Sequence, residues 1–382
     1  MKFKLSDICG FRKGKVSVST LTLQTYVSTE NMLPNKGGII VANSLPTVEF
    51  TQEYKKGDIL VSNIRPYFKK IWQARWDGGC SNDVLVFQGN SNINRDFLYY
   101  TLANDDFFAY SMATSKGTKM PRGDKTSIMK YEVPAFDIDT QIRIASVIRC
   151  LDEKIELNAA INNNLEAQAQ AYFIDRFIAN ADPAWPQGTL SDLGTVVGGG
   201  TPSKRHPEYY SEHGIPWITP KDLSVDKSKF ISHGENDISD IGFSNSSATK
   251  MPEGTVLFSS RAPIGYIAIA SNAVTTNQGF KSVIPNTNVG TAFMYFFLKQ
   301  VLPTIERMAS GSTFKEISGS GMKSVPAVIP DNETLRMFSA FCKPLFQQQA
   351  LLEAENRRLS SIRDALLPKL MSGELDVSDI DF

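Results

Sequence analysis

The chain has few of the residues that usually build metal sites and disulfides. Its 382 residues include four cysteines and three histidines. The cysteines (Cys9, Cys80, Cys150 and Cys342) are scattered, without the paired spacing of a metal knuckle or the density of a secreted disulfide scaffold. The histidines all fall within residues 206–233, in one polar stretch typical of a solvated segment. We therefore expect free thiols in a reducing compartment and no metal site.

The sequence also lacks long apolar runs and an excess of charge of one sign. No run approaches the roughly 18 apolar residues that span a membrane, and residues 1–7 are not followed by the apolar core of a signal peptide. We expect a soluble, cytoplasmic protein with no membrane partner. The 40 basic and 40 acidic residues give a formal net charge of zero. Any binding of a polyanion must therefore depend on local basic patches.

Enzyme signatures are missing as well. We find no HExxH, GxSxG, DxD or EF-hand pattern. Residues 196–205 (VVGGGTPSKR) look like a phosphate-binding loop, but Pro202 has no N–H to offer and no glycine precedes Lys204. Residues 182–185 (DPAW) resemble the Asp-Pro-Pro-aromatic motif of amino-methyltransferases, with Ala184 in place of the second proline. No catalytic set emerges, so we predict a protein that is not an enzyme and binds no cofactor itself.

What the sequence does contain is an internal repeat. Residues 57–66 (GDILVSNIRP) return as residues 254–263 (GTVLFSSRAP), with Gly, Leu, Ser and Pro in step. Three further matches follow the same order: residues 5–8 with 190–193, residues 81–83 with 276–278, and residues 112–118 with 308–312. Four matches at a common shift of roughly 190 residues indicate a tandem duplication.

Each copy ends in a segment with a heptad pattern. Its mainly apolar positions alternate steps of three and four residues, which predicts two long helices that pair along one seam. Asn162 and Asn356 fall at equivalent seam positions, where a polar side chain fixes register at a cost in stability. The predicted seam residues are Ile144, Ile148, Leu151, Ile155, Asn162, Leu165, Phe338, Leu345, Leu352, Asn356 and Leu359.

The segments before each helix are of mixed type. They contain strand-like runs such as residues 59–61, 84–87 and 256–258, together with aromatic helical stretches. We predict an α+β fold: two similar mixed α/β globular domains separated by two long helices that pair as an antiparallel coiled coil, in a pseudo-two-fold repeat. The predicted boundaries are residues 1–138 (domain one), 139–178 (first helix), 179–189 (linker), 190–331 (domain two), 332–371 (second helix) and 372–382 (C-terminal tail).

The length of the helices has a geometric consequence. A helix of about 38 residues is roughly 57 Å long. An antiparallel pair of that length could present the two domains to DNA sites separated by more than one turn of the duplex, about 34 Å.

At this point the residues carry a resemblance to a known family. The second copy resembles the target-recognition domain of a type I restriction-modification specificity (S) subunit, through residues 190–193 (LSDL), 199–203 (GGTPS), 209–210 (YY), 214–218 (GIPWI) and 222–223 (DL). Residues 137–142 (DIDTQI) are similar to the start of that family's first conserved helix, and residues 363–375 (RDALLPKLMSGEL) to the end of the second. The first copy lacks both the GGTP run and the IPWI run.

This resemblance implies a DNA-reading subunit without catalysis. Each domain would read one half of a bipartite site on double-stranded DNA, and the helices would set the spacing. The helices would also dock methyltransferase (modification) subunits that carry S-adenosylmethionine, and separate restriction/translocase subunits would complete the complex. Partner subunits could neutralise DNA phosphates, which suits the neutral chain. The alternative is a coiled-coil assembly protein whose two domains bind peptides or proteins.

Residues suited to DNA contact occur as local sets in both copies. Base reading needs amides, hydroxyls or cations on exposed loops, and cations contact phosphates. Arg65 and Arg261 are the first choices, because each follows a strand-like run and precedes a proline turn, whereas Trp72, Trp76 and Trp217 are expected in the core. The alternative for each set is an ordinary solvated turn. The predicted DNA-binding residues are Arg12, Lys13, Lys15, Arg65, Tyr67, Lys69, Lys70, Lys116, Lys119, Arg122, Ser203, Lys204, Arg205, Arg261, Asn277, Gln278, Lys281, Ser312, Thr313 and Lys315.

Overall fold

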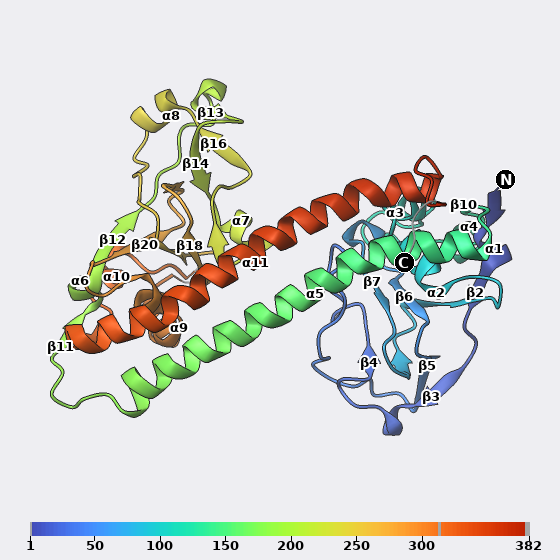
Figure 1. The fold of residues 1–382 in the computed structure, drawn as a ribbon, viewed down its shortest axis with the longest axis horizontal. Coiled ribbons are helices and arrows are strands. Elements are labelled where there is room, and N and C mark those ends of the chain that lie inside the picture. Colours follow the sequence, from blue (N-terminus) through green and yellow to red (C-terminus); the bar gives the residue numbers. More distant parts are fainter. Residues whose placement is uncertain (1, 312–314, 379–382) are drawn as a thin grey trace. The chain divides into compact units, whose positions relative to one another are not determined.

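The computed structural model describes residues 2–311 and 315–378. The chain divides into two compact units. Unit 1 combines the chain up to Ile155 with the chain from Arg358 onward, and unit 2 comprises Glu156–Arg357. The long helices α5 (Ile138–Ile174) and α11 (Asn332–Ser372) each contribute to both units, so each unit contains a globular part and a stretch of both helices (Figure 1).

Unit 1 is built on two four-stranded sheets and one short pair of strands. The sheet of order β2-β9-β6-β7 is antiparallel throughout. The sheet of order β3-β5-β8-β4 ends in a parallel pair, β4 with β8. The bounds are β1 (Lys2–Lys4), β2 (Cys9–Phe11), β3 (Lys15–Ser17), β4 (Tyr26–Val27), β5 (Phe50–Tyr54), β6 (Ile59–Ser62), β7 (Ile71–Gln73), β8 (Gly78–Cys80), β9 (Val84–Gly89) and β10 (Glu132–Pro134), with β1 paired to β10.

Helices pack on these sheets to close the core of unit 1. Asn94 begins α2 by accepting hydrogen bonds from the backbone N–H groups of Asp96 and Phe97. Phe87 and Phe107 pack in one buried cluster with apolar side chains from both long helices. The short helices are α1 (Leu5–Ile8), η1 (Val18–Thr20), η2 (Pro66–Phe68), α2 (Arg95–Ala103), α3 (Asp105–Ala113) and α4 (Lys125–Ile128).

Unit 2 repeats this arrangement with a larger sheet. Its sheets have the orders β12-β20-β17-β18-β15 and β13-β16-β14-β19, and β11 pairs with β21. The predicted strand at residues 256–258 is the start of β17, which is buried at every position. The bounds are β11 (Gln187–Thr189), β12 (Gly194–Gly198), β13 (Tyr210–Ser211), β14 (Ile215–Ile218), β15 (Phe230–Ile231), β16 (Asn236–Ile238), β17 (Val256–Ser260), β18 (Ile264–Ala270), β19 (Thr275–Thr276), β20 (Lys281–Pro285) and β21 (Pro326–Val328).

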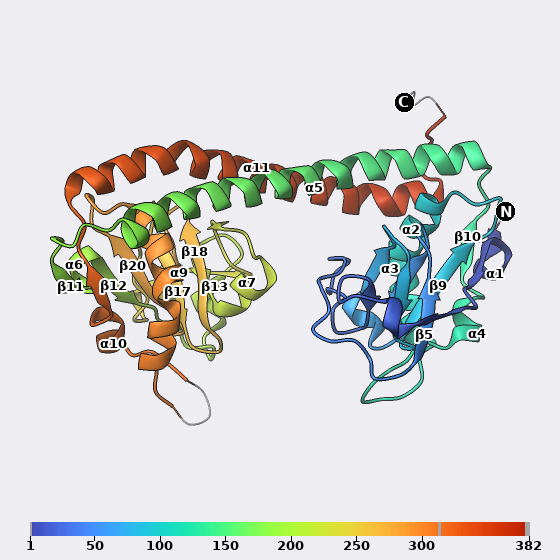
Figure 2. The same ribbon diagram turned by 90° about the horizontal axis from the view of Figure 1, so that it is seen from below.

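One aromatic helix covers the five-stranded sheet of unit 2. α9 (Thr291–Met308) crosses the face made by β17, β18 and β20 (Figure 2). Residues 292–298 of this helix are all buried, because the sheet lies on one side and the long helices on the other. The remaining helices are η3 (Asp175–Ala179), α6 (Leu190–Leu193), η4 (Pro207–Tyr209), α7 (Pro220–Val225), α8 (Asp240–Ser244) and α10 (Gly319–Lys323).

Within each unit the two long helices contact each other. In unit 1, Arg363 of α11 donates to Asp152 of α5 at 2.9 Å. In unit 2, Asn158 of α5 donates to Asn356 of α11 at 2.9 Å. Among the predicted seam residues, Ile144, Ile148, Phe338 and Leu352 are buried, and Leu151, Ile155, Asn162, Leu165, Leu345, Asn356 and Leu359 are partly buried.

The two asparagines at equivalent repeat positions, Asn162 and Asn356, do not contact each other in the structure. Asn158, which is fully buried, is the partner of Asn356. Asn162 instead lies opposite Gln349, whose Nε2 donates to the Asn162 carbonyl oxygen at 3.1 Å. Equivalence in the repeat and contact across the seam are different relations, because helices that run in opposite directions place early residues of one beside late residues of the other.

A buried lysine joins the globular part of unit 2 to both long helices. Lys229 precedes β15, and its Nζ donates to Glu166 of α5 at 2.6 Å and to Gln349 of α11 at 2.9 Å. The ring of Phe346 lies 3.4 Å from this ammonium group and that of Tyr295 lies 4.5 Å away. Burial lowers the pKa of Lys229 to about 8, although the carboxylate of Glu166 opposes that shift.

Within residues 2–311 and 315–378, no helix is both long and apolar enough to cross a membrane.

Candidate nucleic-acid interface

Backbone hydrogen bonds define a short exposed turn in unit 1. The N–H of Ser81 donates to the carbonyl oxygen of Val27 at 2.9 Å, and the N–H of Asn63 donates to that of Asp83 at 2.8 Å. These bonds fix both ends of the turn at residues 81–83. Asn82 is at its tip and is exposed.

Two equivalent backbone hydrogen bonds define a turn in unit 2. The N–H of Asn277 donates to Ile218 at 3.1 Å, and the N–H of Ser260 donates to Gly279 at 2.7 Å. The tip of the turn at residues 277–279 is Gln278, which is exposed. The structural equivalent of residues 81–83 is therefore 277–279, one residue later than the match read from the sequence. That match was wrong by one position because it paired similar letters instead of backbone positions.

The predicted arginine pair is also one position out of register. Ile64 and Arg261 form equivalent isolated β-bridges, each at the end of a strand. Arg65 is therefore equivalent to Ala262, and both have left-handed backbone angles, with φ of 51° and 48°. Arg65 is therefore one position later in the repeat than Arg261. The two guanidinium groups consequently start from different backbone positions and do not point in equivalent directions.

The glycine loop that follows β12 packs against the unit-2 turn. A Cβ atom on Gly199 would lie 2.0 Å from the carbonyl oxygen of Asn277, and one on Gly200 would lie 2.3 Å from the amide nitrogen of Ala248. Only glycine allows this approach. The carbonyl oxygen of Gly200 accepts a hydrogen bond from Trp217 Nε1 at 2.9 Å, and Thr201 Oγ1 donates to Gln278 Oε1. The loop is therefore a packed support for the turn.

Beside this loop, unit 2 has a hollow of about 500 Å³. It collects polar side chains from segments that are far apart in the sequence, as a ligand-binding site does. Four predicted DNA-binding residues line it: Lys204, Arg261, Asn277 and Gln278. The other lining residues were not predicted to contact DNA; they are Thr201, Trp217, Thr219, Pro220, Lys221, Asp222, Glu235, Asn236, Ala262 and Gly279.

Carboxylates balance part of the positive charge near the hollow. Glu316 lies 3.4 Å from Arg261 and 3.8 Å from Lys281. Glu235 pairs with Lys221 at 2.5 Å, and this contact raises the pKa of the lysine. Lys204 forms no ion pair within the described residues. It is therefore the cation most available to an incoming phosphate.

The other predicted residues of unit 2 fall outside the hollow lining. Ser203, Arg205 and Lys315 are exposed and Lys281 is partly buried. Ser312 and Thr313 lie outside the described residues. Of the predicted core tryptophans, Trp72 and Trp217 are buried, and Trp76 is partly buried.

In unit 1 the predicted basic residues lie in several loops. Lys13, Lys15, Tyr67, Lys116, Lys119 and Arg122 are exposed, and Arg65, Lys69 and Lys70 are partly buried. Several are paired within the unit: Lys69 with Asp105 at 2.8 Å, Lys116 with Asp124 at 2.5 Å and Arg122 with Asp83 at 3.1 Å. Lys70 donates to the carbonyl oxygen of Thr29 at 2.6 Å, and burial lowers its pKa.

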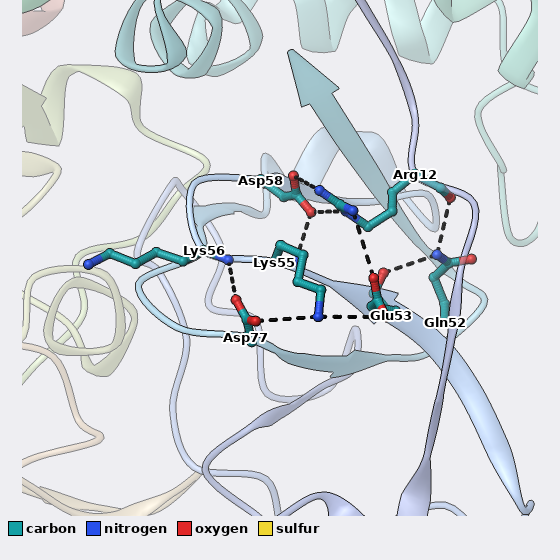
Figure 3. A network of polar contacts seen from close by, with 7 residues as sticks. All are labelled: Arg12, Gln52, Glu53, Lys55, Lys56, Asp58 and Asp77. Atoms are coloured by element: carbon teal, nitrogen blue, oxygen red, sulfur yellow. Dashed lines mark hydrogen bonds and ion pairs between the residues drawn. The ribbon is translucent and has the colours of Figure 1, made fainter. Parts of the chain in front are cut away.

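Arg12 has an internal role that the sequence did not reveal. Its guanidinium donates to both carboxylate oxygens of Asp58 and lies 3.7 Å from Glu53 (Figure 3). Lys55 extends the network from Glu53 to Asp77. The hydrogen bonds to Asp58 raise the pKa of Arg12. With its side chain only 17% exposed, Arg12 is held by carboxylates inside unit 1, which leave little of its charge for a DNA phosphate.

The three histidines do not form a metal site in the described part of the chain. That part contains no group of three or more His, Cys, Asp or Glu side chains placed to hold an ion. His206 is exposed, contacts Glu208 at 2.9 Å and stacks on Tyr209. Cys9, Cys80 and Cys342 are buried and Cys150 is exposed, all as free thiols.

Comparison with known proteins identifies the family. Residues 1–167 and 184–359 match the type I restriction modification DNA specificity domain. The chain belongs to the type I restriction-modification DNA specificity family. This assignment confirms the prediction of a specificity subunit that is not itself an enzyme. It does not favour the alternative of a peptide-binding assembly protein.

Individual relatives agree with this assignment. The chain is 26% identical to the type I restriction enzyme HindI specificity subunit of Haemophilus influenzae, over 98% of this chain and 99% of the relative. It is 42% identical to the MjaIX specificity subunit of Methanocaldococcus jannaschii over 151 residues, which cover 39% of this chain and 35% of the relative.

A solved structure shows that the fold is shared as well. The S subunit of the type I restriction-modification system of M. genitalium superposes with a TM-score of 0.60 and 18% sequence identity. The match covers 97% of this chain and 96% of that one. The specificity family thus explains the mixed α and β architecture that the sequence predicted.

Proposed function

We propose that this chain reads a bipartite site on double-stranded DNA, one half-site with the globular part of each unit. The observation that carries the proposal is the hollow of unit 2, where cations and amides meet. Lys204 and Arg261 supply positive charge for phosphates, and Gln278 supplies a donor and an acceptor for a base edge.

The long helices have a separate part in the proposal. α5 and α11 act as an antiparallel coiled coil within a pseudo-two-fold repeat, and they set the spacing of the two half-sites. The polar pair of buried Asn158 and partly buried Asn356 supports this role, because a polar contact in an apolar seam is satisfied in only one register.

The proposed partners act in the cytoplasm. Methyltransferase subunits dock on the helical regions and carry S-adenosylmethionine, and restriction/translocase subunits join the same complex. The chain itself holds no cofactor. Its formal net charge of zero is compatible with DNA binding because partner subunits share in phosphate neutralisation.

Replacement of Arg261 tests the division of labour. Arg261→Ala removes a cation from the unit-2 hollow, so recognition of one half-site should relax while the other is unchanged. The full chain is co-expressed with its methyltransferase subunits, and the methylated motif is mapped in genomic DNA. Lys250→Ala, at an exposed position outside the hollow, is the matched control. Equal relaxation of both half-sites would refute the assignment of one half-site to each unit.

The salt dependence of binding provides a second measurement. The affinity of the complex for duplex DNA should fall linearly on a logarithmic scale with salt, with a slope of about −0.9 per neutralised phosphate. Lys204→Ala should reduce the magnitude of that slope by about one contact for any DNA sequence. An affinity that does not change with salt would favour a protein or peptide ligand instead.

A further inference from the structure

The unit-2 turn at residues 277–279 is fixed on several sides. The carbonyl oxygen of Gly279 accepts from the N–H of Ser260 at 2.7 Å and from its hydroxyl at 3.1 Å. The carbonyl oxygen of Thr276, just before the turn, accepts from the N–H of Gly200 at 2.8 Å. A residue at the tip of such a turn is held in place before a ligand arrives, which is the condition for selective recognition.

The two amides of this turn have different tasks. Asn277 Oδ1 accepts from the N–H of Gly279 at 2.8 Å, so its side chain closes the turn. Gln278 is exposed at the tip and lines the hollow. Its Oε1 accepts from Thr201, its one hydrogen-bond partner in the described part of the chain. The Nε2 protons and the second lone pair of Oε1 therefore remain for a ligand.

Unit 1 places another amide at the equivalent point. Asn82 is the tip of the turn at residues 81–83, fixed by the same two backbone bonds. It is exposed, and its side chain has no hydrogen-bond partner within residues 2–311 and 315–378. Similar turns of this size are common, but here the same kind of side chain occupies the same position in both copies.

We infer that Gln278 and Asn82 are the base-reading amides of the two half-sites, and that each recognises the adenine of an A·T pair. The inference rests on the proposed function. Asn and Gln side chains pair with adenine through two hydrogen bonds in the major groove, one donated to N7 and one accepted from the N6 amino group. Thr201 is a positioning residue, because its hydroxyl holds the Oε1 of Gln278 in one orientation.

Motif mapping tests the inference. The full chain is co-expressed with the methyltransferase subunits of its system, and methylated sites in genomic DNA are read at base resolution. Gln278→Ala should relax one A·T position in one half-site, and Asn82→Ala should relax one in the other. The expected loss of discrimination is roughly five- to 150-fold at each position. Asn272→Ala, at an exposed position away from the hollow, should leave the motif unchanged.

Two further variants separate base reading from loss of structure. Gln278→Glu keeps the size of the side chain but can only accept, so preference should move from adenine towards cytosine, whose N4 amino group donates. Thr201→Val should weaken discrimination at the Gln278 position alone, and Thr201→Ser should restore it. The thermal unfolding temperature of each purified variant is measured as well. A temperature equal to that of the wild type would show that the fold is intact.

The outcomes are distinct. A wild-type motif that persists in both alanine variants would overturn the inference while leaving the proposed function standing. So would relaxation of the same half-site by both variants, or relaxation at a position that is not A·T. If the wild-type complex methylates no bipartite motif, the proposed function fails and the inference fails with it.

Discussion

Replacing Lys229 by methionine removes the charge that joins the globular part of unit 2 to the long helices. The lysine contacts Glu166 on α5 and Gln349 on α11, and its side chain is 7% exposed. Methionine has a similar length and fills the same space among the rings of Phe346 and Tyr295. The change thus tests the polar contacts and not the packing.

Several terms set the size of the effect. Gln349 Oε1 loses its donor, and an unpaired buried acceptor costs about 1–3 kcal/mol. Breaking a buried ion pair by removing one partner costs about 3–5 kcal/mol when the other charge is left uncompensated. Glu166, however, keeps Lys299 at 2.7 Å. The ammonium also no longer has to be desolvated, which offsets part of the loss. We expect unit 2 to lose about 3 kcal/mol of unfolding free energy.

The dependence on pH gives a second signature. The pKa of Lys229 is lowered to about 8 in the folded protein, so between pH 8 and its ordinary value of 10.5 the unfolded chain binds more protons. Stability from this group therefore rises with pH across that window. The deficit of Lys229→Met relative to wild type should grow over the same range. The ionisable groups around the ammonium are Glu166, Lys299 and Cys342. Glu166 and Cys342 titrate outside this window, because the lysines lower the pKa of Glu166 and burial raises the pKa of Cys342 to about 12.

Hydrogen exchange measured by mass spectrometry is the suitable assay, because it separates unit 2 from unit 1 within the intact chain. Amides of β15 and α9 should exchange faster in Lys229→Met at pH 7, while those of β6 and β9 should not change. Lys227→Met, at a nearby exposed position, is the control. A difference below about 0.5 kcal/mol, the usual size of a surface effect, would refute the view that Lys229 anchors the unit. So would a deficit that shrinks as pH rises above 8.

Two other changes address the glycine loop and the network of unit 1. Gly199→Ala places a methyl group against the turn that carries Gln278, so it should lower unit-2 stability by about 1–3 kcal/mol; unchanged urea unfolding of that variant would show that the loop moves aside freely. Arg12→Met leaves the carboxylate of Asp58 buried without its cation and should cost about 3 kcal/mol in unit 1, whereas Lys13→Met at an exposed site should cost little. If Arg12→Met and Lys13→Met have the same free energy of unfolding, the Arg12 network contributes nothing to stability.

The long helices and several strands could be predicted because their signals are local. Steps of three and four residues place every seam residue on one face of a helix, and the structure buries or partly buries all of them. Likewise the apolar runs at residues 59–61, 84–87 and 256–258 lie in β6, β9 and β17. Such patterns depend only on neighbours within a few residues of each other.

The site was predicted less completely because it depends on contacts between distant segments. A basic residue in a turn looks the same in sequence whether it contacts DNA or a carboxylate 46 residues away, as Arg12 does with Asp58. Lys221 and Asn236 reach the hollow only because α7 and β16 bring them there. The partners of Lys229 lie 63 and 120 residues away, with no motif to mark them.

The repeat explains how a shared backbone can serve two different half-sites. Arg122 in unit 1 and Glu316 in unit 2 occupy equivalent β-bridges beside the strand end that leads to the predicted arginines. Arg122 pairs with Asp83 at 3.1 Å, whereas Glu316 pairs with Arg261 and Lys281. The bridges are made by N–H and C=O groups alone, so the side chains at these positions are free to reverse their charge without loss of the fold. Selection on DNA sequence can therefore act on the loop side chains of one unit independently of the other, and this is the property that a bipartite reader requires.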